Sequence, residues 1–206
     1  MTTMTRRSLF RAGGITALAG FGAAAMSAPA LAAPGEIVTG YKYQAQSTPY
    51  NCGPTAGAMC LSAKGVHVSA DELGRAMKLT TEGTTFGNVA PALTQYIKRA
   101  DPNASYTGQW IDGNDATPQQ VEEMWNRFVK NAQGGFGSMC NWWVPAGKYP
   151  GAPDKGVIYH YVAVVGVNTD NHHVLIADSA RFHGNETYWL PKGEVATFCA
   201  GRGYFW

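Results

Sequence analysis

Hydrophobic residues recur at helical spacing between residues 50 and 130. Behind Cys52, four apolar residues stand at positions i, i+3, i+4 and i+7: Ala56, Met59, Cys60 and Ala63. This spacing predicts a short helix with one apolar face packed on a core. Two later segments carry helix-start signals as well, namely a capping serine at Ser69 and the pair Thr117-Pro118. We therefore expect helices near residues 52–63, 69–77, 89–99 and 117–130.

The second half of the chain changes to strand patterns. Residues 157–167 are apolar at nearly every position, which predicts a central strand buried on both faces. After a short turn, residues 171–178 are predicted to form the returning strand of a hairpin. Shorter strands are expected around residues 106–110 and 136–144. Helices come first and strands afterwards, which predicts an α+β fold with a helical part packed on an antiparallel sheet.

A hairpin with a three-residue turn would bring two polar residues of these strands together. If Val167 pairs with Asn171, positions whose numbers add up to 338 lie opposite each other, and His160 then faces Asp178. A longer turn would move the two residues into a diagonal contact. Either register places an imidazole near a carboxylate.

The first 32 residues have the organisation of an export signal. The adjacent residues Arg6 and Arg7 precede an uncharged Gly/Ala-rich run that ends in the small-x-small sequence Ala30-Leu31-Ala32. We predict a signal peptide of the twin-arginine type, handled by the twin-arginine export machinery and cleaved after Ala32, and one domain over residues 33–206. An ordinary secretory signal and a retained membrane anchor are the alternatives. The predicted location is outside the bacterial cytoplasm, in the periplasm or cell envelope or in the medium.

Composition and charge exclude several classes of partner. Beyond residue 32, 13 basic side chains stand against 14 acidic ones, and no basic run occurs. A near-neutral chain of this kind gives no reason to expect a nucleic acid or an anionic membrane as partner. The sequence also lacks the metal-binding spacings CxxC and HxxxH, so we expect neither a metal nor another cofactor. An apolar content of 45% indicates a packed globule.

Four cysteines lie beyond the predicted signal: Cys52, Cys60, Cys140 and Cys199. Cys52 stands at a predicted helix start, where the partial positive charge of the helix N-terminus favours a thiolate and hence a nucleophile. Cys60 lies about 12 Å further along the same helix, too far for a disulfide with Cys52. Cys140 and Cys199 could form a disulfide or remain thiols, and the sequence does not decide between these states.

Cys52, His160 and Asp178 together supply the parts of a thiol-based active site. Each of the last two alone has a simpler explanation, because a buried histidine often bonds a backbone carbonyl and an aspartate at a strand end often caps a turn. In combination, the three residues provide a nucleophile, a general base and a group that orients the base, in the order Cys, His, Asp.

These residues lie in motifs that resemble those of the bacteriocin-leader (double-glycine) peptidase-like family of cysteine peptidases. The motifs are Gln46-x5-Cys52-Gly-Pro, then His160-Tyr-Val-x-Val-x-Gly, then a strand that ends in Asp178. The resemblance extends over most of residues 33–206 and implies a papain-like fold. It implies that Cys52 is the nucleophile, His160 the base and Asp178 the residue that orients the imidazole. The Gln46 side-chain amide and the Cys52 N–H would donate to the oxyanion, with Gln44 as the alternative to Gln46.

The resulting hypothesis is an exported thiol hydrolase, a cysteine peptidase that cleaves a peptide or protein substrate through a thioester acyl-enzyme. A cell-wall peptide is one candidate substrate, since the cell wall lies outside the membrane. An acyl transferase of transglutaminase type would use the same thioester with an amine as acceptor. A cell-wall amidase is a further alternative, although such enzymes usually have Asp-Cys-Ser-Gly where this chain has Asn51-Cys52-Gly53-Pro54. A catalytically silent peptide-binding module is the alternative from a different class.

Overall fold

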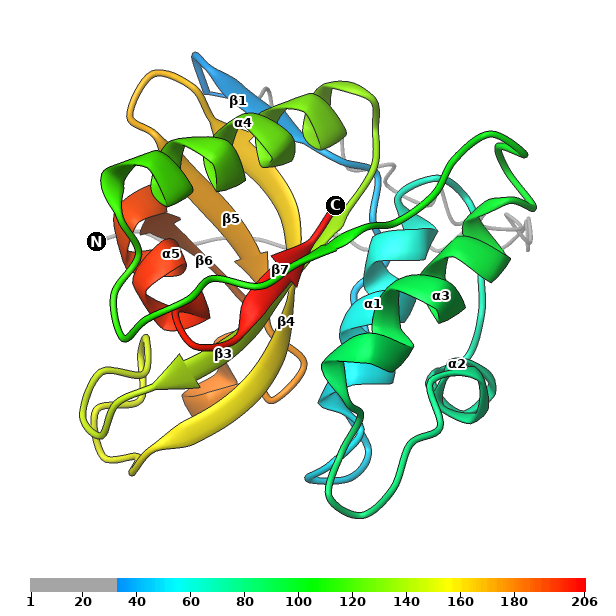
Figure 1. The fold of residues 1–206 in the computed structure, drawn as a ribbon, viewed down its shortest axis with the longest axis horizontal. Helices are drawn as coiled ribbons and strands as arrows, with labels where there is room; N and C mark the ends of the chain where they lie inside the picture. Colours follow the sequence, from blue (N-terminus) through cyan, green and yellow to red (C-terminus); the bar gives the residue numbers. More distant parts are fainter. Residues whose placement is uncertain (1–32) are drawn as a thin grey trace, which may run out of the picture. The chain divides into compact units, whose positions relative to one another are not determined.

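An antiparallel sheet of seven strands lies between two groups of helices in the computed structural model, which describes residues 33–206 (Figure 1). Helices α1 (Cys52–Ser62), α2 (Ala70–Ala76) and α3 (Phe86–Ile97) form one group, and α4 (Pro118–Gln133) and α5 (Lys192–Cys199) form the other. The predicted export signal, residues 1–32, lies outside the described residues. Among residues 33–206, no helix is long and apolar enough to cross a membrane.

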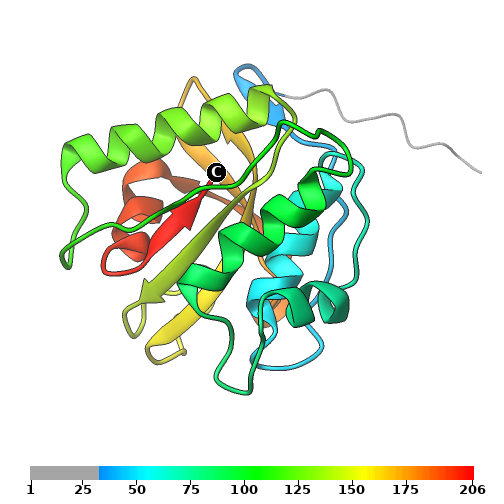
Figure 2. The ribbon, with the colours of Figure 1, turned by 45° about the vertical axis from the view of Figure 1, so that its right-hand side comes forward.

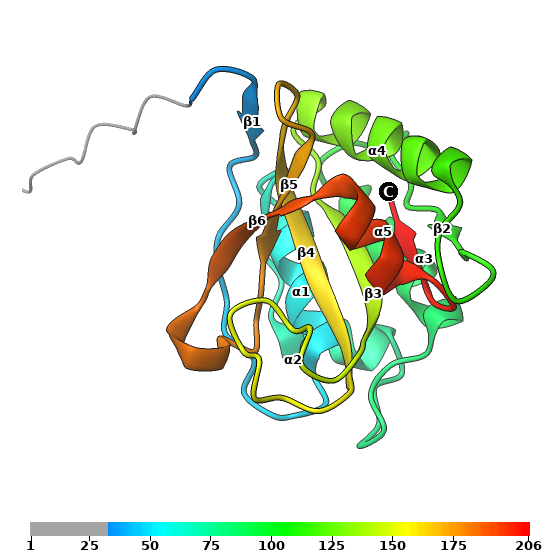
Figure 3. The same cartoon turned by 90° about the vertical axis from the view of Figure 1, so that its left-hand side faces the viewer.

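The strands are β1 (Glu36–Val38), β2 (Gly108–Gln109), β3 (Ser138–Val144), β4 (Ile158–Asn168), β5 (His173–Ala177), β6 (Thr187–Pro191) and β7 (Gly203–Phe205). Their order in the sheet is β2-β7-β3-β4-β5-β6, and all neighbouring pairs are antiparallel. Figure 3 shows β6, β5, β4 and β3 side by side in this succession. β1 pairs with the last three residues of β4, beyond the part of β4 that pairs with β3. The expected α+β class, with helices packed on an antiparallel sheet, is confirmed.

Capping signals locate two of the helix starts. Ser69 Oγ accepts a hydrogen bond from the Glu72 N–H (3.1 Å) at the start of α2. At the start of α4, Thr117 Oγ1 accepts from the Gln120 N–H (3.3 Å) while Gln120 Oε1 accepts from the Thr117 N–H (2.8 Å). These bonds satisfy N–H groups that have no partner inside the helix. The predicted starts of α2 and α4 are therefore confirmed, whereas α3 begins at Phe86 rather than at position 89.

Strand β4 is buried on both faces, as its apolar sequence predicts. Its residues alternate between two hydrophobic cores: Tyr161, Ala163 and Val165 pack with α1, α2 and α3, and Val162 and Val164 pack with α4 and α5. A bulge between Val164 and Gly166 reverses the alternation, so that Val167 also joins the second core. The sheet thus serves both cores and connects the two helical groups.

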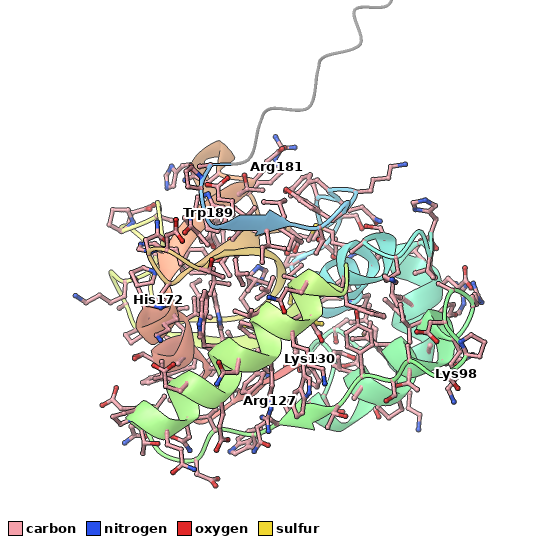
Figure 4. All side chains as sticks on the ribbon, turned by 90° about the horizontal axis from the view of Figure 1, so that it is seen from above. Lys98, Arg127, Lys130, His172, Arg181 and Trp189 are labelled. Carbon is pink, nitrogen blue, oxygen red and sulfur yellow. The ribbon has the colours of Figure 1, made fainter. Side chains whose placement is uncertain are left out.

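The helices α1 and α4 are buried to different degrees. One stripe of α4 is buried against the second core, and Lys130 lies on the exposed side, seen in Figure 4. In α1 all eleven residues are buried. The expected packing of α1 on a core is confirmed, and its burial extends beyond the apolar stripe, because α2 and α3 cover the sides of α1 that do not contact the sheet (Figure 2).

The close approach of α1 to the sheet depends on Gly137, just before β3. A Cβ at this position would lie 2.6 Å from Cys60 Cα and 3.0 Å from Cys60 Cβ. Atoms at these distances overlap, so any side chain at position 137 would push α1 away from the sheet. Gly137 therefore sets the distance between the helix that carries Cys52 and the sheet that carries His160.

The hairpin of β4 and β5 has a longer turn than expected. The observed pairs are Val167 with Val174 and Asn168 with His173. The expected pairing of Val167 with Asn171 is wrong, because Asn168 Oδ1 accepts two backbone hydrogen bonds from Asp170 and Asn171 and holds them in the turn. His160 and Asp178 therefore do not stand directly opposite each other, and they meet diagonally across the two strands.

Candidate active site

Cys52 is the first residue of α1, as the sequence predicts, and it is 8% exposed. The turn before the helix is held by Asn51, whose Nδ2 donates to Ser47 Oγ (2.9 Å) and whose Oδ1 accepts from the Thr48 N–H (3.3 Å). Because its side chain is used in this way, Asn51 does not cap the first N–H groups of α1. These N–H groups and the positive end of the helix dipole lie beside the Cys52 sulfur.

His160 lies on β4, Asp178 directly follows β5, and both side chains are buried. The distance between His160 Nε2 and Asp178 Oδ1 is 2.9 Å, that of a hydrogen bond. The imidazole also lies beside the Cys52 thiol, close enough to shift its pKa, and Nδ1 is the ring nitrogen that the bond with Asp178 leaves for the thiol. The structure therefore brings Cys52, His160 and Asp178 together from three separate segments, with the imidazole between the thiol and the carboxylate.

The carboxylate of Asp178 accepts four hydrogen bonds, two on each oxygen. Oδ1 accepts from His160 and from the Ala180 N–H (2.9 Å), and Oδ2 accepts from Tyr149 Oη (2.6 Å) and Tyr188 Oη (2.8 Å). Tyr149 comes from the loop between β3 and β4, and Tyr188 comes from β6. Neither tyrosine belongs to a sequence motif, so only the fold reveals them. Together they fix the carboxylate with Oδ1 toward the imidazole.

The pKa values of Cys52, His160 and Asp178 shift in directions that favour the charged form of each group. Burial raises the pKa of the Cys52 thiol, but the hydrogen bond and the charge of His160 outweigh burial and lower the pKa below its ordinary value. Burial lowers the pKa of His160, whereas the contacts with Asp178 and Cys52 raise it to about 10. Burial raises the pKa of Asp178, but its hydrogen bond with His160 lowers it overall. All three shifts favour the charged forms: a thiolate, an imidazolium and a carboxylate.

Gln46 lies against the segment that follows Asp178. Its N–H donates to Ser179 O (2.9 Å), and its Oε1 accepts from Ser179 Oγ (2.9 Å). Gln46 Nε2 donates one proton to Thr48 O (3.0 Å), and the second amide proton remains free for another acceptor. Gln46 lines a cleft of about 470 Å³ that also borders His160, whereas Gln44 does not line this cleft. Of the two glutamines, Gln46 is the one that lines a cleft together with His160.

Cys52 and His160 line a second, larger cleft of about 620 Å³. One wall is formed by residues 80–86. The facing side chains come from the sheet and its flanking loops: Trp110, Asn141, Tyr159, Tyr161 and Arg202. Gly53 lets the first wall approach α1, because a Cβ at this position would lie 2.8 Å from Thr84 Cγ2. The two clefts share Pro49, Tyr159 and His160, so both border the imidazole.

The other cysteines have different surroundings. Cys60 Sγ donates to Ser138 O (2.8 Å), and burial raises the pKa of this thiol. Cys140 and Cys199 are buried free thiols, and burial and the neighbouring Cys199 raise the pKa of Cys140. Within residues 33–206, no group of three or more His, Cys, Asp or Glu side chains is arranged to hold a metal ion. Of Cys52, Cys60 and Cys140, only Cys52 has a lowered pKa.

A thiol at the start of a buried helix, beside a histidine and an aspartate on an antiparallel sheet, is the architecture of papain-like cysteine peptidases. The chain belongs to the Peptidase_C39 like family, whose model matches residues 38–200. The match includes Cys52, His160 and Asp178 and covers most of the described residues. The protein is therefore a C39-like cysteine peptidase.

Solved structures share this fold at low sequence identity. The peptidase domain of Streptococcus ComA, a bifunctional ABC transporter of a quorum-sensing pathway, has a TM-score of 0.50 and 14% identity over 81% of this chain and 96% of that one. A double glycine motif protease from an AMS/PCAT transporter, in complex with its leader peptide, has a TM-score of 0.53 and 15% identity over 82% of this chain and 92% of that one. Sequence identities of 14% and 15% establish that the folds are shared and nothing more. A comparison with curated proteins gives no match.

Proposed function

We propose that the protein is an exported cysteine peptidase in which Cys52, His160 and Asp178 act as a catalytic triad. The observation that carries this proposal is that the His160 imidazole is hydrogen-bonded to Asp178 and lies beside the Cys52 thiol. Export rests on residues 1–32, whose paired arginines and Ala30-Leu31-Ala32 sequence have the pattern of a twin-arginine signal. The bond that is cleaved is a peptide or amide bond.

The first half of the reaction forms a thioester. The Cys52 thiolate attacks the carbonyl carbon of the scissile bond, and the carbonyl oxygen becomes an oxyanion. The Cys52 N–H and the free Nε2 proton of Gln46 serve as the oxyanion donors, and such donors typically lower the barrier by about 3 kcal/mol each. The His160 imidazolium gives its proton to the leaving nitrogen, the C–N bond breaks and an amine departs.

The second half hydrolyses the thioester. A water molecule attacks the thioester carbonyl while neutral His160 accepts one of its protons. The C–S bond breaks, a carboxylic acid leaves, and the thiolate and the imidazolium are formed again. Asp178 stays ionised throughout and holds the imidazole in orientation, with Tyr149 and Tyr188 fixing its other oxygen.

A peptide is the substrate class that fits this site. The clefts of about 620 Å³ and 470 Å³ border the same imidazole, so an extended chain can occupy both sides of the scissile bond. The leader peptide bound in one structurally similar protease supports this class. An exported enzyme would meet its substrates outside the cytoplasm, and cell-wall peptides are among them.

Mass spectrometry of acid-quenched reactions tests the proposal. With pools of synthetic peptides in H₂¹⁸O, we expect a peptide fragment attached to Cys52 and released fragments that carry ¹⁸O in a new carboxyl terminus. If an added alkylamine is incorporated in place of ¹⁸O, the protein is an acyl transferase of transglutaminase type. If no pool yields either an adduct or a cleaved product between about pH 5 and pH 8, the proposal is wrong and a silent binding module replaces it.

A further inference from the structure

Arg202 brings a positive charge into the cleft of Cys52 without a carboxylate partner. It directly precedes β7 and is half-buried. Its guanidinium carbon lies 4.3 Å from the centre of the Tyr159 ring. Within residues 33–206, no carboxylate oxygen lies within 4.0 Å of the Arg202 guanidinium. Two other arginines do form such pairs: Arg99 with Glu72, and Arg181 with Glu186.

The surroundings of Arg202 suit a carboxylate from a bound molecule. Stacking on Tyr159 restricts the orientation of the guanidinium plane and leaves its edge free. That edge carries N–H groups in a fork that matches the two oxygens of a carboxylate. Partial burial weakens solvent screening, so an ion pair formed here is stronger than one on the open surface.

Exposed aromatic rings flank this charge. Tyr159 is 61% exposed and Trp110 is 42% exposed, although both line the cleft. The indole of Trp110 is held edge-to-face against Phe86, with 5.3 Å between the ring centres. Rigid aromatic side chains offer a large apolar contact area with little conformational entropy to lose on binding. The wall of the cleft therefore combines one free guanidinium with apolar contacts beside it.

We infer that the cleft shared by Cys52 and Arg202 selects peptides with an acidic residue, whose carboxylate pairs with the Arg202 guanidinium. Apolar or aromatic residues of the same peptide would contact Trp110 and Tyr159. The inference rests on the proposed function, because it names the substrate class of the same site. The acidic residue belongs to the substrate segment in the Cys52 cleft, since the cleft lined by Gln46 does not include Arg202.

Glu82 is the carboxylate that lines this cleft, and it lies in the wall formed by residues 80–86. It is exposed, in a turn closed by hydrogen bonds between Thr80 and Gly83. Water and salt screen an exposed carboxylate more than a half-buried guanidinium. Glu82→Gln should therefore strengthen the preference for acidic peptides slightly, and Arg202 should dominate that preference.

Protection of Cys52 from iodoacetamide tests this inference without requiring turnover. The probes are matched pairs of pools of end-blocked hexapeptides. The two pools of a pair differ only in having Glu or Gln at one defined position, and each position of the peptide has its own pair. The best Glu pool should protect Cys52 at an about tenfold lower concentration than its Gln counterpart. Arg202→Gln should reduce this ratio to about one, and Arg202→Lys should keep part of it, because lysine keeps the charge but lacks the fork.

A matched control and clear contrary outcomes accompany this experiment. Arg75→Gln changes an arginine on α2 outside both clefts and should keep the full preference. Equal protection by Glu and Gln pools at every position, protection by no pool, or a preference that survives Arg202→Gln would overturn the inference. The rate at which Cys52 reacts with iodoacetamide in the absence of peptide distinguishes the two proposals. A Cys52 that reacts at about pH 6 no faster than an ordinary thiol contradicts the proposed function, whereas a fast Cys52 without a Glu preference contradicts this inference alone.

Discussion

Replacing Cys52 with alanine is expected to abolish peptide hydrolysis, with a loss of at least about 10⁴-fold in kcat/KM. The variant lacks the sulfur that forms the thioester, and the nearest other thiol on α1, Cys60, is fully buried with a raised pKa. The measurement is the hydrolysis of an internally quenched peptide pool at neutral pH. Far-UV circular dichroism and the melting temperature should show that Cys52→Ala remains folded.

Cys60→Ser is the matched control for this experiment. The serine hydroxyl can keep the hydrogen bond that Cys60 donates to Ser138 O, so the fold and the hydrolysis rate should both be retained. Residual hydrolysis by Cys52→Ala above about a hundredth of the wild-type rate would show that another group is the nucleophile. Loss of activity in Cys60→Ser, with an unchanged melting temperature, would also contradict the assignment to Cys52.

The second large effect is expected at Asp178. Asparagine can still accept a hydrogen bond from His160 Nε2, but it removes the negative charge that helps to raise the pKa of His160. In Asp178→Asn, kcat should fall about 10²-fold, and the alkaline limb of the pH profile should move to lower pH because His160 loses its proton sooner. Asp178→Ala also removes the acceptor, and its loss should reach about 10³-fold.

The two tyrosines on Asp178 provide the control for this prediction. Tyr149→Phe and Tyr188→Phe remove donors to Oδ2 and leave the charge of Asp178 in place. Their kcat values should fall about 3–10-fold, more in the double variant, and the alkaline limb should not move to lower pH. If Asp178→Asn leaves the alkaline limb unchanged, the carboxylate does not hold the imidazolium. If the double tyrosine variant is fully active at every pH, the tyrosines only support the fold.

Elements defined by local chemistry are the ones that the sequence predicts well. Ser69 and Thr117 mark helix starts through hydrogen bonds to residues three positions away, so the information lies within one turn. Strand β4 is predicted because an apolar run on both faces leaves few other possibilities. Cys52 likewise is placed at a helix start by its immediate neighbours.

Elements defined by distant partners are predicted poorly. β1 and β6 are edge segments that form because β4 and β5 offer them partners, and neither has a strong pattern of its own. The apolar pattern predicts a shorter turn after β4, because it does not reflect the two hydrogen bonds that Asn168 accepts. The complete burial of α1 depends on α2 and α3, which its own sequence does not specify.

The candidate site shows the same division. Cys52, His160 and Asp178 carry recognisable chemistry, and the fold places them together. Tyr149 and Arg202 come from loops, where the sequence pattern carries no information on which side chain reaches the site. Gln46 lines a cleft together with His160, and its role as an oxyanion donor stays a prediction.

The rate of Cys52 alkylation against pH tests most directly whether Cys52 and His160 form a thiolate–imidazolium pair. Because the pKa of Cys52 is lowered, iodoacetamide should modify it at about pH 5–6, and the rate should fall only as the pH drops through that lowered pKa. His160→Ala removes the imidazole that offsets the effect of burial, so the pKa of Cys52 should rise. The same reaction should then require a pH above the ordinary thiol pKa of about 8.5. A wild-type Cys52 that reacts no faster than Cys60, or whose pH dependence is unchanged in His160→Ala, would contradict the pair.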